Sequence, residues 1–425
     1  MSIWFLDKPL ARRPGLGAVL ALLALVALGV LAMAAGPASA ARPRAHAAYA
    51  QRCDDPFPAT RDRSNPLDLP NAPGPDPLTG ANFFVPGPAH GAASSAIAQL
   101  VGLNTTNIPS DESWASFQQD LTSGPLSQRI SGGQAREVHQ LEIIASQPEA
   151  QRFSIFSGGG GPGAIFGQVE KILCRNLTAD PGSIPIINTY FMHPALGGCS
   201  TAREISAESP VFRRQVGEMA QGIARRPAVT LLELDAIGSS VCMAHNGGLP
   251  AWEADLRYEI NQLAALPHTV VYVEAGYSDA NSPGYTAKIL NAIGVRKIRG
   301  FFTNDTHMNW TIDEIHWAQQ VSAKTGGAHF IVNTSQNGNG PKANPHPVTQ
   351  GNENLCNPPG RALGPLPTTN TGFGHADAFM WTHPPGNSSG CGGGPPSGVF
   401  FPAYAAGLAA RANQKLGPGF ASRPY

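Results

Sequence analysis

The sequence carries little charge of either sign. Its 425 residues include 29 Lys and Arg and 29 Asp and Glu, so the charged fraction is 14 % and the formal net charge is zero. An average globular chain is about 25 % charged. Nucleic acids are bound by basic surfaces, so we expect no nucleic-acid partner. The hydrophobic fraction of 42 % is enough for a buried core, and 48 Gly and 39 Pro indicate long loops.

Residue spacings typical of metal sites are also absent. The six cysteines form no C-x-x-C pair, and the twelve histidines show no H-x-x-x-H or H-E-x-x-H spacing. We therefore expect no metal and interpret the even number of cysteines as disulfides. Residues 158–163 match G-x-G-x-x-G, which is typical of dinucleotide sites. An exported chain would not meet such a cofactor, so no cofactor is expected.

Only one hydrophobic run is long, and it lies near the N-terminus. Residues 16–35 are apolar or small, follow Lys8, Arg12 and Arg13, and precede the small residues 38–40. This pattern predicts that residues 1–40 are a cleaved signal peptide, so the protein would be secreted. The run of 20 residues could instead span a bilayer as an uncleaved anchor. Contact with a membrane is expected only in that second case.

The rest of the chain indicates one large α/β domain. Residues 41–80 are Pro-rich without apolar periodicity and predict an arm or linker, whereas residues 81–425 predict a single catalytic-type domain. Short apolar runs alternate there with helix-compatible segments, as in parallel β-α-β units. Seven strands are expected, at residues 152–156, 184–190, 228–234, 269–273, 297–303, 328–332 and 377–381.

Polar side chains follow most of these predicted strands. Glu233 and Asp235 end one strand, Glu274 ends the next, and residues 304–307, Asn333 and His383 follow three more. Parallel α/β folds bind ligands at the carboxyl ends of their strands. Any one of these residues could simply cap a helix or hold a loop. Their recurrence predicts a binding or catalytic site at this end of the sheet.

Residues 82–420 contain six ordered motifs. They are Leu-Glu-Leu-Asp at 232–235, Tyr-Val-Glu-Ala-Gly-Tyr at 272–277, Gly-Phe-Phe-Thr-Asn at 300–304, Asn-Thr-Ser-Gln-Asn-Gly-Asn-Gly-Pro at 333–341, Cys-Asn-Pro-Pro-Gly-Arg-Ala-Leu-Gly at 356–364 and Asp-Ala-Phe-Met-Trp-Thr-His-Pro-Pro-Gly at 377–386. Together they resemble the motifs of glycoside hydrolase family 6, the inverting β-1,4-glucanases. The resemblance implies a distorted seven-stranded parallel (β/α) barrel. It also implies disulfides between Cys199 and Cys242 and between Cys356 and Cys391. Cys53 and Cys174 then remain as a third pair.

The resemblance places one of the two groups that inverting hydrolysis requires. One carboxylic acid must protonate the leaving oxygen, while a second group activates water on the opposite face of the sugar. Asp235 is at the general-acid position, where burial and the neighbouring Glu233 would favour its protonated form. The helper aspartate of the family's R-D-C motif is Gly198 here, and the aspartate proposed as base is Asn333, which cannot accept a proton. Candidates for a relocated base or support are Glu274, Asp305 and His307.

The substrate-binding positions implied by the family are partly changed. They comprise Asn304, Asn333, Trp381, His383 and Asn387, of which His383 and Asn387 replace the Lys and Glu of K-P-P-G-E. Two aromatic positions of the family are Ala280 and Leu355 here. Because sugars stack on aromatic faces and bind charged groups, these changes indicate a different or weaker glycan preference.

Two hypotheses therefore follow from the sequence. In the first, the protein is a monomeric, secreted hydrolase of β-1,4-glucan polysaccharide or oligosaccharide that uses Asp235 and a relocated base. In the second, it is a catalytically impaired glycan-binding relative that keeps the cleft. Fold alone cannot choose between them, because function depends on the site.

Overall fold

The computed structural model describes residues 71–109, 112–155, 157–180, 182–192, 199–341, 356–412 and 416–417. All described residues belong to one compact unit. The predicted signal or anchor (1–40), Cys53, Gly198 and Leu355 lie outside the described residues. Within the described ranges, the helices are too short or too polar to cross a bilayer.

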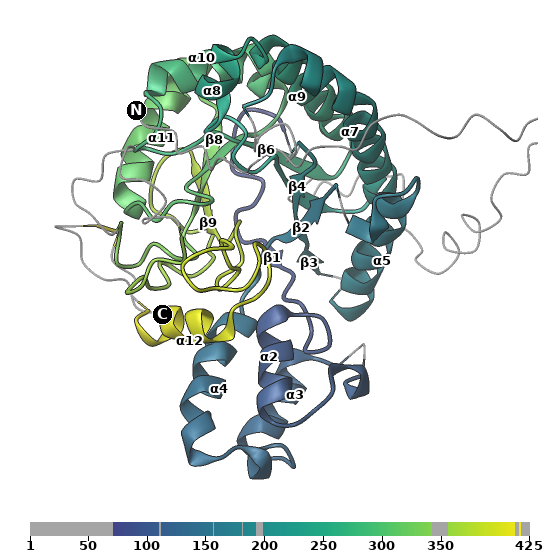
Figure 1. Cartoon of the computed structure of the whole chain (residues 1–425), viewed down its shortest axis with the longest axis vertical. Coiled ribbons are helices and arrows are strands. Elements are labelled where there is room, and N and C mark those ends of the chain that lie inside the picture. The colour runs from purple at the N-terminus through teal and green to yellow at the C-terminus, as the bar shows by residue number, and fades with distance from the viewer. Residues whose placement is uncertain are drawn as a thin grey trace, which may run out of the picture. The chain divides into compact units, whose positions relative to one another are not determined.

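Strands and helices alternate through most of the described chain (Figure 1). The strands are β1 (Asn82–Phe83), β2 (Gln151–Ser154), β3 (Ser183–Ile184), β4 (Ile186–Tyr190), β5 (Ala228–Leu232), β6 (Thr269–Glu274), β7 (Gly300–Thr303), β8 (His329–Asn333) and β9 (Ala376–Met380). The α-helices are α2 (Ala92–Leu100), α3 (Trp114–Thr122), α4 (Gly132–Ala145), α5 (Ala164–Ala179), α7 (Ala202–Ile223), α8 (Ser240–His245), α9 (Leu249–Ala264), α10 (Pro283–Ile293), α11 (Thr311–Thr325) and α12 (Pro402–Ala410).

Seven strands form one parallel sheet in the order β2-β4-β5-β6-β7-β8-β9, so the predicted parallel α/β barrel is confirmed. Each predicted strand has a counterpart with shifted ends. The strand predicted at 184–190 is interrupted at Pro185, which has no N–H to donate to a sheet. Its first part becomes β3, which pairs with β1 in a separate two-stranded sheet.

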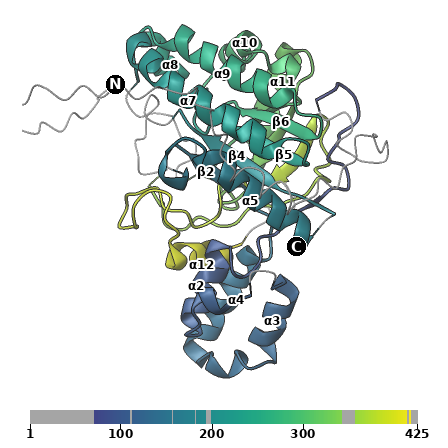
Figure 2. The ribbon, with the colours of Figure 1, turned by 90° about the vertical axis from the view of Figure 1, so that its right-hand side faces the viewer.

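The central strands β5, β6 and β7 are largely apolar because both faces of the sheet are buried there. In β5, Val229 and Leu231 belong to the core inside the barrel, while Ala228 and Leu232 pack in the core outside it. Helices α5, α7, α9, α10 and α11 form the outer layer (Figures 1 and 2). A strand covered on both faces loses the polar alternation of a half-exposed strand. This burial explains the continuous apolar runs in the sequence.

The barrel is open between its first and last strands. No ladder joins β9 to β2 within the described chain, but the Ala150 N–H donates to the Trp381 carbonyl over 3.0 Å. Trp381 itself is fully buried in a second hydrophobic cluster, with residues of α2, α3, α4 and α12. The expectation that Trp381 binds substrate is therefore corrected, because its ring is packed against helices and has no exposed face for a sugar.

Two of the three expected disulfides are present. Cys199 is bonded to Cys242, and Cys356 is bonded to Cys391. The first joins the segment before α7 to α8, and the second fastens the loop that follows β9. Pairing of Cys174 with Cys53 stays a prediction, because Cys53 lies outside the described residues.

Candidate active site

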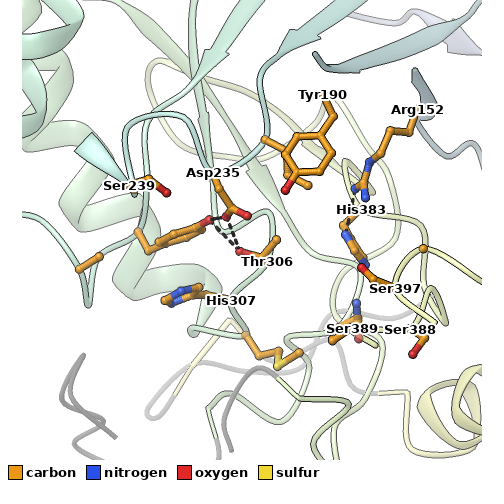
Figure 3. Close-up of a pocket in the computed structure, with 17 residues that line it drawn as sticks. Arg152, Tyr190, Asp235, Ser239, Thr306, His307, His383, Ser388, Ser389 and Ser397 are labelled. Atoms are coloured by element: carbon orange, nitrogen blue, oxygen red, sulfur yellow. Dashed lines mark hydrogen bonds between the residues drawn. The ribbon is translucent and has the colours of Figure 1, made fainter. Parts of the chain in front are cut away.

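A cavity of about 480 Å³ opens at the carboxyl ends of the barrel strands. Its lining comes from loops after several strands, as parallel α/β folds require (Figure 3). The residues labelled in Figure 3 are Arg152, Tyr190, Asp235, Ser239, Thr306, His307, His383, Ser388, Ser389 and Ser397. Asp235, His307 and His383 are thus the sequence-predicted site residues that the structure brings to one cavity.

Glu233 anchors the loop that carries Asp235. Both residues adopt left-handed backbone conformations, with φ of 54° and 60°, just after β5. The Glu233 carboxylate accepts the backbone N–H groups of Phe191 (3.1 Å) and Met192 (2.9 Å), which follow β4. Full burial raises the pKa of Glu233 to about 7. The strained turn is therefore held by hydrogen bonds to the neighbouring strand end.

Glu274 anchors the same loop from the other side. Its carboxylate accepts the N–H groups of Ile237 (2.9 Å) and Gly276 (2.5 Å), and its side chain is fully buried. Burial, and secondly the charge of Asp235, raise the pKa of Glu274 well above its ordinary value. Its two oxygens are used to hold the backbone, so Glu274 is corrected from candidate base to a support of the Asp235 loop.

The Asp235 side chain is held by two hydroxyl groups. Its Oδ1 accepts from the Tyr277 hydroxyl and from Thr306 Oγ1 (2.8 Å), and these two hydroxyls lie 2.7 Å apart. Burial and the charge of Asp235 raise the pKa of Tyr277, so the phenol keeps its proton. The Tyr277 ring also packs closely on Gly238, where an added Cβ would lie 2.9 Å from a ring carbon. The carboxyl group is thus fixed in one orientation facing the cavity.

His307 lines the cavity beside Tyr277. The two rings stack with centroids 3.7 Å apart and planes 5° apart. His307 Nδ1 lies 2.9 Å from Asp279 Oδ1, and Asp279 also accepts from Asn309 Nδ2 over 2.8 Å. Because a carboxylate only accepts, Nδ1 carries the proton, which leaves Nε2 with a lone pair when the ring is neutral. His307 is therefore oriented as a possible proton acceptor.

Asp305 lies behind the cavity surface. Its side chain is buried, accepts a hydrogen bond from Thr382 Oγ1, and lies 3.9 Å from the Arg152 guanidinium. Burial raises the pKa of Asp305 to about 7, although the positive charge of Arg152 opposes the shift. Asp305 is not among the residues that line the cavity. Asp305 is corrected as a direct base candidate, because its side chain is buried and does not line the cavity.

Asn304 and Asn333 hold loops together and do not line the cavity. Asn333 Nδ2 donates to the carbonyls of Asn304 (2.9 Å) and Asp305 (3.1 Å), and its Oδ1 accepts from the Thr382 N–H (3.1 Å). Asn304 Nδ2 in turn donates to the Asn333 carbonyl. Both residues are buried. Their expected substrate contacts are corrected to structural ones, and an aspartate at 333 could not make the two donations.

The side of the cavity opposite Asp235 is built around Arg152. Arg152 Nη2 lies 3.0 Å from His383 Nδ1, and the guanidinium carbon lies 5.9 Å from the Tyr190 ring centroid (Figure 3). Burial and the charge of Arg152 lower the pKa of His383 to about 3, so this imidazole is neutral. Asn387, expected to bind substrate, contacts His383 through its backbone and is not among the lining residues.

Four lining residues were given no role from the sequence: Arg152, Tyr190, Tyr277 and Thr306, although Thr306 belongs to the segment 304–307 that was expected at the site. A signal existed for two of them: Arg152 begins and Tyr190 ends a predicted strand, where polar residues interrupt apolar runs. Tyr277 stands where the resembled family motif has His. In the described part of the chain, no group of three His, Cys, Asp or Glu side chains is arranged to hold a metal ion.

Comparisons with known proteins agree with this fold. A family model described as glycosyl hydrolases family 6 matches residues 195–412. Endoglucanase 1 of Streptomyces sp. (strain KSM-9) is 33 % identical over 282 residues, covering 63 % of this chain and 70 % of that protein. Endoglucanase A of Cellulomonas fimi is 31 % identical over 274 residues, covering 64 % of this chain and 56 % of that protein.

A solved structure is similar over most of the described barrel. It is the endoglucanase Cel6 from Mycobacterium tuberculosis in complex with methyl-cellobiosyl-4-deoxy-4-thio-β-D-cellobioside. The TM-score is 0.63 at 28 % identity, covering 79 % of this chain and 99 % of that one. The fold and the site define a glycoside hydrolase of the α/β-barrel class. The chain belongs to glycosyl hydrolases family 6, as its motifs predicted.

Proposed function

We propose that this protein hydrolyses β-1,4-glucan chains by an inverting mechanism in which Asp235 is the general acid. The observation that carries the proposal is the position of Asp235 in the cavity, fixed by Tyr277 and Thr306. Relatives named endoglucanases, and one relative bound to a cellobiose-derived thio-oligosaccharide, support β-1,4-glucan as the substrate class.

The chemistry needs two proton transfers. Protonated Asp235 gives its proton to the glycosidic oxygen as the bond from that oxygen to the anomeric carbon breaks. A water molecule adds to the anomeric carbon from the opposite face and loses its proton to a base. Asp235 lines the cavity while the two hydroxyls hold its Oδ1, so the carboxyl group faces the substrate without a side-chain rotation.

We assign the role of base to His307. Of the three candidates named from the sequence, His307 lines the cavity, whereas Glu274 and Asp305 are buried behind it. Asp279 holds the proton on Nδ1 and would stabilise the imidazolium that forms when Nε2 accepts a proton from water. Asp279 is a positioning residue in this scheme, since it acts through His307.

A catalytically impaired, glycan-binding protein is the second candidate. One observation favours it: among the described residues that line the cavity, Asp235 is the only carboxylate. An enzyme that has lost its second carboxylate would still bind a glycan through the same cavity. The two candidates differ in turnover and not in binding.

We also propose that the protein is secreted and acts as a monomer. The N-terminal pattern predicts export, and the bonds Cys199–Cys242 and Cys356–Cys391 suit an oxidising compartment. An uncleaved anchor at residues 16–35 remains the alternative form of export. Mass spectrometry of the exported protein tests this point, because cleavage predicts a new N-terminus near residue 41.

The test of the activity is reducing-sugar release by the full chain from soluble β-glucans and xyloglucan. We expect Asp235→Asn to lower kcat by roughly 10²–10⁴-fold, the usual contribution of a general acid. His307→Gln should lower kcat and remove the basic-group limb of its pH profile, whereas His316→Gln, on the exposed face of α11, should leave both unchanged. Saturable glycan binding by calorimetry without sugar release would establish the second candidate.

A further inference from the structure

One cation faces the cavity. Arg152 lies on β2, the edge strand of the sheet, and its side chain is 19 % exposed. Among the described residues that line the cavity, it is the only Lys or Arg. It lies across the cavity from Asp235, on the same side as His383, Ser389 and Ser397 (Figure 3). The cavity therefore has an acid side and a cationic side.

The hydrogen-bonding groups of Arg152 are incompletely used. Nη2 donates to His383 Nδ1 over 3.0 Å, which requires a neutral imidazole because a guanidinium only donates. Nε is buried and has no hydrogen-bond partner among the described residues. A buried donor without a partner costs free energy unless a ligand or water supplies an acceptor. Nη1 forms no hydrogen bond with the described residues and is not buried, so the guanidinium retains capacity for an acceptor from the cavity through its terminal nitrogens.

The positive charge of Arg152 is also weakly matched. The nearest carboxylate oxygen is Asp305 Oδ2 at 3.9 Å, beyond hydrogen-bond distance, and it has no hydrogen-bond partner of its own. Burial raises the pKa of Asp305 to about 7, so a large share of this carboxyl is neutral near neutral pH. His383 is neutral there as well. No full negative charge lies in direct contact with the guanidinium.

We propose that the cavity takes a β-1,4-linked glycan that bears a carboxylate, and that Arg152 binds this carboxylate. The proposal rests on the glucan-type substrate proposed above and specifies its chemistry. A planar guanidinium fits a carboxylate with two parallel hydrogen bonds, which a neutral sugar hydroxyl cannot accept. The hydroxyls of Ser389 and Ser397, on the same side, are suited to the neutral hydroxyls of the sugar. The recognised group is the same whether the carboxylate is C6 of a uronic acid unit or belongs to a substituent attached to a hydroxyl.

The test compares carboxylated with neutral substrates on the full chain. The pairs are carboxymethyl cellulose with hydroxyethyl cellulose, and C6-oxidised cello-oligosaccharides with their unoxidised parents. We expect kcat/KM to be roughly ten-fold higher on the carboxylated member of at least one pair, as a charged hydrogen bond provides. A higher kcat/KM on carboxymethyl cellulose alone would show that the recognised carboxylate belongs to a substituent. A higher kcat/KM on the C6-oxidised oligosaccharides would show that it is the C6 carboxylate of the sugar unit.

Variants of Arg152 separate binding from folding. Arg152→Gln should reduce the carboxylated-to-neutral ratio to about one, and Arg152→Lys should retain part of it, because Lys keeps the charge but loses the planar fork. Arg257→Gln, a matched change on the exposed face of α9, should leave the ratio unchanged. Because both substrates are measured on each variant, a general loss of folded protein cancels in the ratio. Salt at 0.5 M should also reduce the ratio of the parent protein.

The outcomes distinguish this proposal from the proposed activity. Hydrolysis of both members of each pair with a ratio near one overturns the carboxylate proposal and leaves the glucanase activity standing. Without hydrolysis, calorimetry on the Asp235→Asn variant decides: preferential binding of the carboxylated member supports the carboxylate proposal while the activity fails. Equal binding, or none, overturns both.

Discussion

A buried aspartate at each end of the barrel has its pKa shifted in the opposite direction. Asp305 at the carboxyl end and Asp377 at the amino end are almost equally buried, at 1 % and 2 % exposure. Burial raises the pKa of Asp305 to about 7. Burial acts on Asp377 in the same direction, but hydrogen bonds and charges from His329 and Arg299 hold its pKa below the ordinary value. Equal burial therefore gives opposite protonation because the neighbours differ.

The amino end is closed by a fully paired cluster. Asp377 accepts from Arg299 Nε (2.8 Å) and from the Tyr272 hydroxyl (2.7 Å), and lies 2.6 Å from His329 Nδ1. Arg299 also donates to the Ala72 carbonyl, which holds the end of the N-terminal arm under the barrel. This cluster joins strands β6, β8 and β9 and contributes to stability.

The carboxyl end instead collects carboxyl groups whose pKa values are raised to neutral pH or in that direction. Burial raises the pKa values of Glu233, Glu274 and Asp305 around the loop of Asp235. Their partners there are mostly neutral N–H and O–H donors. Groups of this kind suit an acid-catalysed reaction, whereas paired charges suit a structural closure.

The largest expected effect is the difference in unfolding free energy between Asp→Asn substitutions at the two ends of the barrel. Asp377→Asn leaves the Arg299 charge buried without its partner, and we expect a loss of about 3–5 kcal/mol in the free energy of unfolding. Asp305→Asn replaces a largely neutral carboxyl with a neutral amide and should cost less than about 1 kcal/mol at pH 6. Urea unfolding of both variants measures the difference. Equal losses would contradict the contrast between the ends.

The second effect comes from adding a carboxylate to each end. Asn333→Asp removes two buried donations and adds charge beside Asp305, so we expect a loss of about 2 kcal/mol. Asn71→Asp at the amino end loses one donation, to Thr269, but its Oδ1 already accepts the backbone N–H groups of Val271 and Arg299, which stabilise a carboxylate and should make the cost smaller. Thermal unfolding of the two variants compares them. A larger cost for Asn71→Asp would count against the electrostatic difference.

The smallest expected effect is a difference in how the stability of the parent protein and that of Asp305→Asn depend on pH. The folded pKa of Asp305, about 7, lies above its ordinary value of 3.8, so its contribution to stability is full below pH 4 and is lost as the pH rises through 7. From pH 5 to 8, the parent should lose at least about 1 kcal/mol of unfolding free energy relative to Asp305→Asn, since one pKa unit is about 1.4 kcal/mol. Asp120→Asn, an exposed change on α3, should run parallel to the parent. Parallel curves of unfolding free energy against pH for the parent and Asp305→Asn would show that the pKa of Asp305 is not raised.

Much of the barrel could be predicted from the sequence because burial on both faces leaves a clear signal. Apolar runs such as residues 228–232 and 269–273 are strands β5 and β6, paired in parallel along their lengths. The ends of strands were predicted less well, since they depend on local features such as Pro185. The cluster of α2, α3, α4 and α12 joins segments more than 250 residues apart and left no periodic signal that links them.

The site was predictable where a residue follows its own strand, as Asp235 and His307 do. The sequence could not show which polar residues turn toward the cavity and which hold loops. Asn333 and Glu274 have the residue types of a site, yet their hydrogen bonds go to backbone groups of neighbouring loops. Arg152 and His383 are 231 positions apart, and only the closing of the sheet brings them together.

The opening of the barrel between its first strand, β2, and its last strand, β9, also determines when the cavity can form during synthesis. Arg152 leaves the ribosome early, while His383 and the serines after β9 are among the last residues made. The acid side can assemble from β5, β6 and β7 before that point, because its strands are neighbours in both sequence and sheet. The cationic side needs both β2 and the segment that follows β9. A family 6 barrel built this way completes its cavity only after strand β9 and the loop behind it have been made.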